Sequence, residues 1–102
     1  MKLLTEEIRS KLPPLYSQEA VKDPQVICKF FYPDFHWRWY AIEFDGKDTF
    51  FGYVAGDFLE LGYFTLSELE ANRGLIGLRI ERDMFFVPTP LSEVRKLHER
   101  VR

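Results

Sequence analysis

The chain has 102 residues with a single cysteine, and its net charge at pH 7 is −2. This length predicts one domain over residues 1–102 that buries enough surface to fold alone, and the lone cysteine excludes an internal disulfide scaffold. No apolar run reaches the ~20 residues of a membrane span, and two leucines after Met1 and Lys2 are too few for a signal peptide. We therefore expect a soluble, cytoplasmic protein that does not engage a membrane.

The first half of the chain predicts one helix followed by three strands. The helix begins after Thr5, whose side chain can cap it, and ends before Pro13 and Pro14. Runs rich in β-branched and aromatic residues then predict strands at 26–32, 35–46 and 49–55. The tight-turn sequence DGKD at 45–48 predicts that the last two of these strands pair antiparallel.

The second half predicts a fourth strand at 60–66 and then a short helix, for which Ser67 and Glu70 match a capping box. The run DMFFV predicts a strand at 83–87, and Thr89 as N-cap with Pro90 at the first helical position predicts the terminal helix. This order indicates an α+β single domain. We expect a mostly antiparallel sheet of four to five strands, with short N-terminal, middle and C-terminal helices packed mainly on one face.

The strand predicted at 35–46 carries large rings on both of its faces. Side-chain alternation places one set on the first face, Trp37, Trp39, Ala41, Glu43 and Asp45, and the other set on the second, Arg38, Tyr40, Ile42 and Phe44. We assign Tyr40, Ile42 and Phe44 of the second set to the core. The first set would then be left partly exposed to solvent, because three short helices cover one sheet face well but hardly two.

Two interpretations of the first face stay open. In one, Trp37 and Trp39 pack beneath the terminal helices or long loops. In the other, Trp37, Trp39, Glu43 and Asp45 form a partner-binding surface, since monomers seldom expose large apolar patches. A homodimer through this face would also cover it. Stacking of nucleic-acid bases on this face is disfavoured. The segment from Asp34 to Glu70 contains eight acidic residues and only two basic ones, so it would repel the phosphate backbone.

The basic end of the chain offers an alternative surface for nucleic acid. Arg95, Lys96, Arg100 and Arg102 stand there against Glu99 alone. A solvated helix face explains such a run, and a patch for phosphate or an acidic partner is the other interpretation.

Metal, cofactor and nucleophile chemistry are only weakly signalled. Acids and a lysine gather around the predicted turn, Glu43, Asp45, Lys47 and Asp48, but without a diagnostic spacing for a metal-dependent nuclease. His36 and His98 lie in different elements, and Cys28 sits in an apolar run typical of a core residue. We therefore assign no metal site, no cofactor and no catalytic residue.

Four long stretches carry a family resemblance: LLTEEIRSKLPPLYSQE, WRWYAIEFDGKDTFFGYV, ELGYFTLSELE and GLRIERDMFFVPTPLSEV. From Met1 to about Val94 the chain resembles the bacterial domain-of-unknown-function family numbered 2958. The resemblance implies a small protein of plasmids, conjugative elements and prophages, often encoded among antirestriction and DNA-processing genes. It brings no catalytic residues. The chain departs from the family pattern in one region, VAGDFLEL, where the turn looks variable in such proteins.

Two functional hypotheses follow. The first is a non-enzymatic protein-interaction module of a mobile genetic element that binds a host or element-encoded protein. It would act in counter-defence, as an antirestriction or anti-CRISPR-like protein, or as an accessory of element maintenance, and the counter-defence role rests on the resemblance alone. The second is a nucleic-acid-binding or metal-dependent DNA-processing protein that uses the basic terminal helix or the acidic turn.

Overall fold

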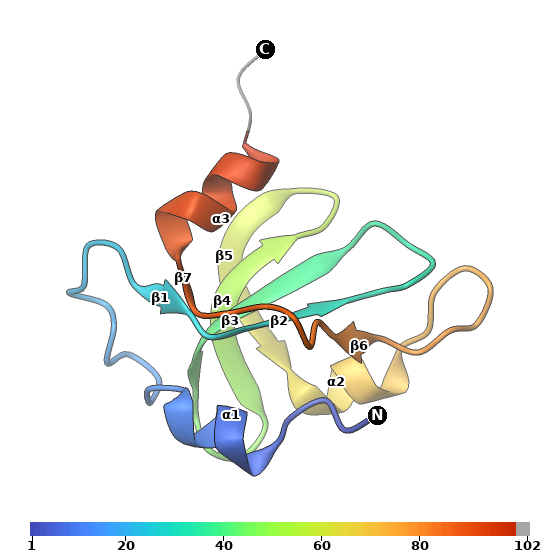
Figure 1. Cartoon of the computed structure of the whole chain (residues 1–102), viewed down its shortest axis with the longest axis horizontal. Coiled ribbons are helices and arrows are strands. Elements are labelled where there is room, and N and C mark those ends of the chain that lie inside the picture. Colours follow the sequence, from blue (N-terminus) through green and yellow to red (C-terminus); the bar gives the residue numbers. More distant parts are fainter. Residues whose placement is uncertain (100–102) are drawn as a thin grey trace.

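The computed structural model describes residues 1–99, in which a five-stranded antiparallel sheet, a two-stranded sheet and three short helices form an α+β domain (Figure 1). In chain order the elements are α1 (Glu6–Lys11), β1 (Gln25–Val26), β2 (Cys28–Phe31), β3 (Arg38–Phe44), β4 (Thr49–Ala55), β5 (Leu59–Thr65), α2 (Leu66–Ala71), β6 (Glu81–Arg82), β7 (Thr89–Pro90) and α3 (Leu91–His98). The large sheet has the order β5-β4-β3-β2-β6, and β1 pairs with β7. The predicted fold class is confirmed.

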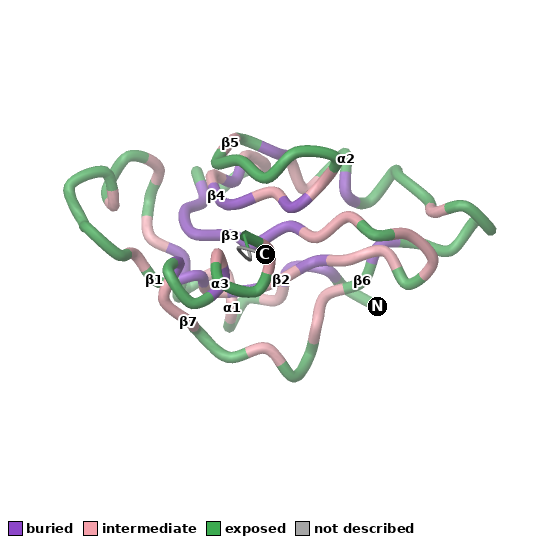
Figure 2. The backbone as a smooth tube through the Cα atoms, turned by 90° about the horizontal axis from the view of Figure 1, so that it is seen from above, coloured by how far each residue is buried: buried purple, intermediate pink, exposed green. Residues whose placement is uncertain are grey.

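The two faces of the large sheet are covered by different segments. On one face, which we call the α2 face, the N-terminal segment, α1 and α2 pack against a cluster of rings that includes Phe30, Trp39 and Phe50. On the other, the α3 face, Leu91 and Val94 of α3 pack against strand residues. Two of the three helices thus gather on one face, and the third completes the core on the other. Figure 2 shows the central strands as the most buried part of the chain.

A β-bulge in β3 changes the predicted alternation of its side chains. Ala41 pairs with Gly52, but the next pair is Glu43 with Phe51, so Ile42 is an extra residue. As a result, Ile42 and Glu43 both lie on the α3 face, where they line one small cavity with Phe51. Phe44 turns to the α2 face and packs in the cluster of Phe50. The strict alternation expected for residues 35–46 is therefore wrong after Ala41.

Several element boundaries also differ from the prediction. The capping box of α2 is formed by Thr65 and Glu68 rather than by Ser67 and Glu70. The strand predicted at 83–87 is absent from the described chain, because the Asp83 carboxylate accepts the N–H of Phe85 (2.9 Å) and holds a local turn instead. The two-residue strand β6 precedes this turn.

The terminal helix begins one residue later than predicted. Pro90 is its N-cap and makes no side-chain cap bond. The cap comes from a distant loop: the Asp23 carboxylate accepts the N–H (2.9 Å) and the hydroxyl (2.6 Å) of Ser92. These hydrogen bonds lower the pKa of Asp23 and fasten the loop before β1 to α3.

Candidate functional site

A cavity of about 660 Å³ opens on the α2 face. Its walls come from the β2–β3 hairpin, the β4–β5 hairpin and α2. Aromatic rings supply much of the lining: Tyr32, Phe35, Trp37, Trp39, Phe58 and Phe64. A concave site in which aromatic rings stand beside a few polar groups is the usual form of a binding pocket.

The floor of the cavity is open because β5 lacks a side chain there. Gly62 pairs with Gly52 in β4, which pairs with Ala41 in β3, so three small residues lie side by side across the sheet. A Cβ added to Gly52 would meet the Tyr40 carbonyl oxygen at 1.9 Å, so the fold itself requires that glycine. A Cβ added to Gly62 would meet nothing within 4 Å. The fold does not require Gly62, and its missing side chain leaves the cavity deep.

The two tryptophans form one wall of this cavity. Trp39 is 6% exposed, and its ring lies 5.3 Å from that of Tyr32 and 5.8 Å from that of Trp37, centroid to centroid. Trp37 is half-buried and lies flat on Gly56, where an added Cβ would come within 2.8 Å of the indole. Its Nε1 donates to Asp57 at 3.3 Å. The tryptophans thus line a cavity rather than a flat exposed patch.

Glu43 and Asp45, which the sequence placed with the tryptophans, lie elsewhere. Glu43 is 3% exposed and its carboxylate accepts the N–H groups of Tyr16 (2.9 Å) and Gln18 (2.8 Å), which holds the loop after α1. Asp45 accepts three successive backbone N–H groups in the β3–β4 turn, and these bonds lower the pKa of its carboxyl. The predicted partner-binding set is therefore divided, because the bulge in β3 turns Glu43 to the opposite face.

The charged side chains that line the cavity are all acidic. Asp57, Glu60 and Glu68 contribute carboxylates, and no lysine or arginine belongs to the lining within residues 1–99. Asp57 lies 3.3 Å from His36 Nε2, and Glu68 accepts the N–H of Thr65 in the capping box. In the same described range the Glu60 carboxylate takes part in none of the hydrogen bonds or ion pairs. The site combines aromatic rings with at least one carboxylate free to bind a cation.

Two of the basic residues proposed for nucleic acid, Arg95 and Lys96, form ion pairs with nearby glutamates. Arg95 Nη1 pairs with Glu99 (2.8 Å) and its guanidinium lies 5.2 Å from the Tyr53 ring centre. Lys96 pairs with Glu93 at 2.9 Å. Arg100 lies outside the described residues.

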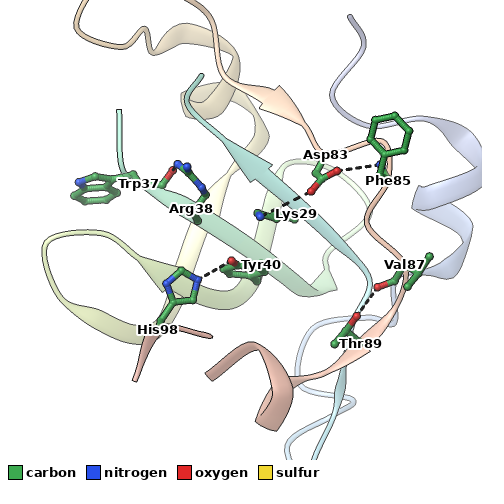
Figure 3. Close-up of polar contacts among 9 residues, drawn as sticks. All are labelled: Lys29, Trp37, Arg38, Tyr40, Asp83, Phe85, Val87, Thr89 and His98. Atoms are coloured by element: carbon green, nitrogen blue, oxygen red, sulfur yellow. Dashed lines mark hydrogen bonds and ion pairs between the residues drawn. The ribbon is translucent and has the colours of Figure 1, made fainter. Parts of the chain in front are cut away.

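A polar cluster joins the end of α3 to the sheet (Figure 3). The Tyr40 hydroxyl and His98 Nε2 are 2.7 Å apart, and Lys29 pairs with Asp83 at 3.8 Å. Burial raises the pKa of Tyr40 to about 12. Burial, with Lys29 and Arg38 nearby, lowers the pKa of His98. At this end of α3 His98 therefore faces the sheet, whereas Leu97 is exposed.

The acids around the β3–β4 turn do not converge on one point. Asp48 accepts the N–H (2.9 Å) and hydroxyl (2.7 Å) of Ser67, whereas Glu43 and Asp45 bind the backbone segments named above. Within residues 1–99, no three His, Cys, Asp or Glu side chains gather as metal ligands would. Cys28 is buried, which raises its thiol pKa to about 12, and it packs in the core as expected. None of the helices in this range has the length and apolarity needed to cross a bilayer.

The fold and the site together define a small α+β domain with an aromatic, acid-lined cavity on one face of an antiparallel sheet. The chain belongs to the family described as Protein of unknown function (DUF2958), whose family model matches residues 3–101. This confirms the resemblance seen in the sequence motifs. Neither the curated proteins nor the solved structures contain a match to the chain.

Proposed function

We propose that this protein is a non-enzymatic protein-interaction module that takes a lysine or arginine side chain of a partner into the cavity on the α2 face. One observation carries the proposal: the cavity joins the Trp37 and Trp39 rings to the Glu60 carboxylate, and no lysine or arginine among residues 1–99 lines it. A cation over an aromatic ring gains about 0.5–2 kcal/mol, and more when water is excluded.

The shape of the cavity suits a long basic side chain. The methylene groups of lysine or arginine would lie against Val54 and Phe64, while the charged end meets the rings and carboxylates. The depth left at Gly62 gives the side chain room to enter. A basic partner segment also suits the acidic middle of the chain, because opposite charges speed encounter and suppress wrong partners.

The partner would be a host or element-encoded protein met in the cytoplasm. The setting on a mobile genetic element, and a role in counter-defence or element maintenance, follow from the family resemblance and stay predictions. So does a homodimer through the aromatic face, which would compete with the partner for the cavity.

Tryptophan fluorescence tests the proposal directly, because both tryptophans of the chain line the cavity. Short peptides of Arg-Gly and Lys-Gly repeats should change the emission in a saturable manner, whereas Glu-Gly repeats should not. The proposal would be overturned if the emission showed no saturable change up to about 1 mM basic peptide, because binding would then be weaker than about −4 kcal/mol. An equal response to the acidic peptide would do the same.

Two glutamates provide a matched pair of variants. Glu60→Gln removes a carboxylate from the cavity and should weaken binding of the basic peptide by roughly two- to fivefold. Glu70→Gln removes the same charge from α2 outside the cavity lining and should leave binding unchanged. Equal effects of the two variants would indicate a general charge effect and no specific site.

The alternative function in nucleic-acid binding or processing is separated by one titration. Labelled single- and double-stranded DNA is added at low salt, with and without magnesium. Binding that Arg95→Gln and Lys96→Gln weaken, or magnesium-dependent cleavage, would favour the alternative. We expect neither, since Lys96 pairs with Glu93 in α3 and Arg95 pairs with Glu99 directly after it.

A further inference from the structure

The two edges of the five-stranded sheet are protected very differently. At one edge lies β6, which has only two residues, Glu81 and Arg82, both charged. Short and charged edge strands resist pairing with other chains. At the other edge lies β5, with seven residues of sequence LELGYFT and a single charge, Glu60. It contains no proline, no lysine and no bulge, and Figure 2 shows it as exposed along one border of the sheet.

The hydrogen-bonding pattern shows which backbone groups of β5 face outward. Leu66 N–H donates to the Asp48 carbonyl at 2.8 Å, which makes this a hydrogen-bonded pair. Because such pairs alternate along an antiparallel ladder, the even-numbered residues of β5 direct their N–H and C=O groups to β4. Those of Leu59, Leu61 and Tyr63 point to the free edge.

The same three residues carry an apolar strip. Their side chains lie on the α3 face, opposite Ala55, Tyr53 and Phe51, and their exposed fractions are 42%, 41% and 56%. An edge strand that is long, regular and apolar on one side is a template for another strand. The outward groups and the strip together mark β5 as an interface.

We propose that β5 pairs antiparallel with β5 of a second copy of this chain, with a two-fold axis through Leu61. Leu61 then lies opposite Leu61 of the partner subunit, and Leu59 opposite Tyr63 of the partner subunit. The outward N–H groups of each copy donate to the outward carbonyls of the other, so the five-stranded sheet becomes continuous across both.

Self-complementarity favours a second copy over a foreign strand. In a two-fold interface the same surface must match itself, and here every pair on the α3 face is apolar with apolar. On the α2 face, Glu60 lies opposite Gly62 of the partner subunit, so the single charge of the strand never faces its own copy. Thr65 at the end of the strand stays outside the pairing, because its N–H is already bound by Glu68 (2.8 Å).

Two matched leucine substitutions test the dimer. Leu61→Lys places a charge at the centre of the interface, whereas Leu97→Lys places the same charge on an exposed position of α3. Light scattering over a concentration series should give twice the chain mass of 12.2 kDa for the wild type and for Leu97→Lys, and the single-chain mass for Leu61→Lys. Circular dichroism verifies that each variant is folded.

Amide hydrogen exchange of the wild type supplies a readout that needs no variant. The N–H groups of Leu59, Leu61 and Tyr63 should exchange more slowly at high than at low protein concentration, while those of β6 should not change. A wild type that stays monomeric at millimolar concentration would overturn the proposal. So would a dimer that Leu61→Lys leaves intact, or one whose β5 amides show no protection.

Discussion

Both faces of the sheet carry aromatic rings, and yet the two faces are filled in different ways. On the α3 face the rings end in hydroxyl groups that bind the covering helix: Tyr40 meets His98 at 2.7 Å, and Tyr53 donates to Glu99 at 2.5 Å. On the α2 face the rings near the cavity include two tryptophans and phenylalanines, and Gly62 leaves a gap among them. Aromatic density alone therefore does not identify a binding face, because rings fasten a helix on one side of the sheet and line a cavity on the other.

The largest effect is expected in the α2-face core away from the cavity. Phe30→Ala removes a fully buried ring that packs 5.6 Å from Phe50 and should lower the free energy of unfolding by about 3–5 kcal/mol. Urea denaturation measures it. Phe85→Ala, on a loop where the ring is 95% exposed, should change stability by less than about 0.5 kcal/mol. Similar losses for both would contradict the assignment of the core.

Next in size is the loss of Glu43. Glu43→Ala leaves the N–H groups of Tyr16 and Gln18 without their acceptor and should cost about 1–3 kcal/mol. Hydrogen exchange should show faster exchange of these two amides, with little change in α3. Unaltered protection of both amides would show that Glu43 does not hold the loop.

On the α3 face, Tyr40→Phe removes one hydrogen bond and should cost about 1 kcal/mol, measured by the urea midpoint at pH 7.5. Tyr32→Phe is the control, because Tyr32 is half-buried and its hydroxyl takes part in none of the hydrogen bonds in the described part of the chain. Equal costs for the two variants would argue against the contact with His98.

A pH dependence on the same face follows from His98. Its pKa is lowered by burial and by Lys29 and Arg38, with Glu99 acting in the opposite direction. As the pH falls, the His98 imidazole takes up a proton near pH 6.5 in the unfolded state and only at lower pH in the folded state. The stabilisation that neutral His98 gives the fold is therefore complete above pH 6.5 and is lost as the pH falls below it. Urea midpoints of the wild type and His98→Gln should therefore converge between pH 7.5 and pH 5. If the two midpoints diverged on acidification, the pKa of His98 would be raised by folding and the prediction would be wrong.

The smallest change in stability, with the largest change in binding, is expected for Gly62→Val. Because an added Cβ meets nothing and valine favours strands, the free energy of unfolding should rise by 0 to about 1 kcal/mol. The valine side chain occupies the cavity floor, so the response of the tryptophan emission to Arg-Gly peptides should weaken at least tenfold. Gly62→Ala should give an intermediate loss. If the Gly62→Val protein still bound Arg-Gly peptides, the cavity would not be their binding site.

Local sequence predicted the regular parts of the sheet well. Strand β4 has the predicted bounds, and β5 is displaced by one residue, because β-branched and aromatic runs with turn signals on both sides leave little choice. The run at 83–87 shows the same composition but forms a turn, since the Asp83 side chain competes for the backbone N–H of Phe85. The amino-acid composition of a segment does not show which side chain will bind a backbone N–H in this way.

The site was predictable only in part. The sequence singled out Trp37 and Trp39, which line the cavity, but it could not place Glu43, because nothing in AIEF at 41–44 signals a bulge. Glu60 and Gly62 were missed. Their signal was the pair of glycines at positions 52 and 62, which become neighbours only once the register of β4 and β5 is known.

Gly62 also bears on how this protein can change over generations. The sheet does not need a glycine at that position, and alanine or valine codons differ from a glycine codon by one base. Single mutations can therefore resize the cavity in steps without a penalty in folding, while Gly52, one strand away, tolerates no such variation. A binding preference that depends on this position would be free to diverge between closely related chains whose folds are the same.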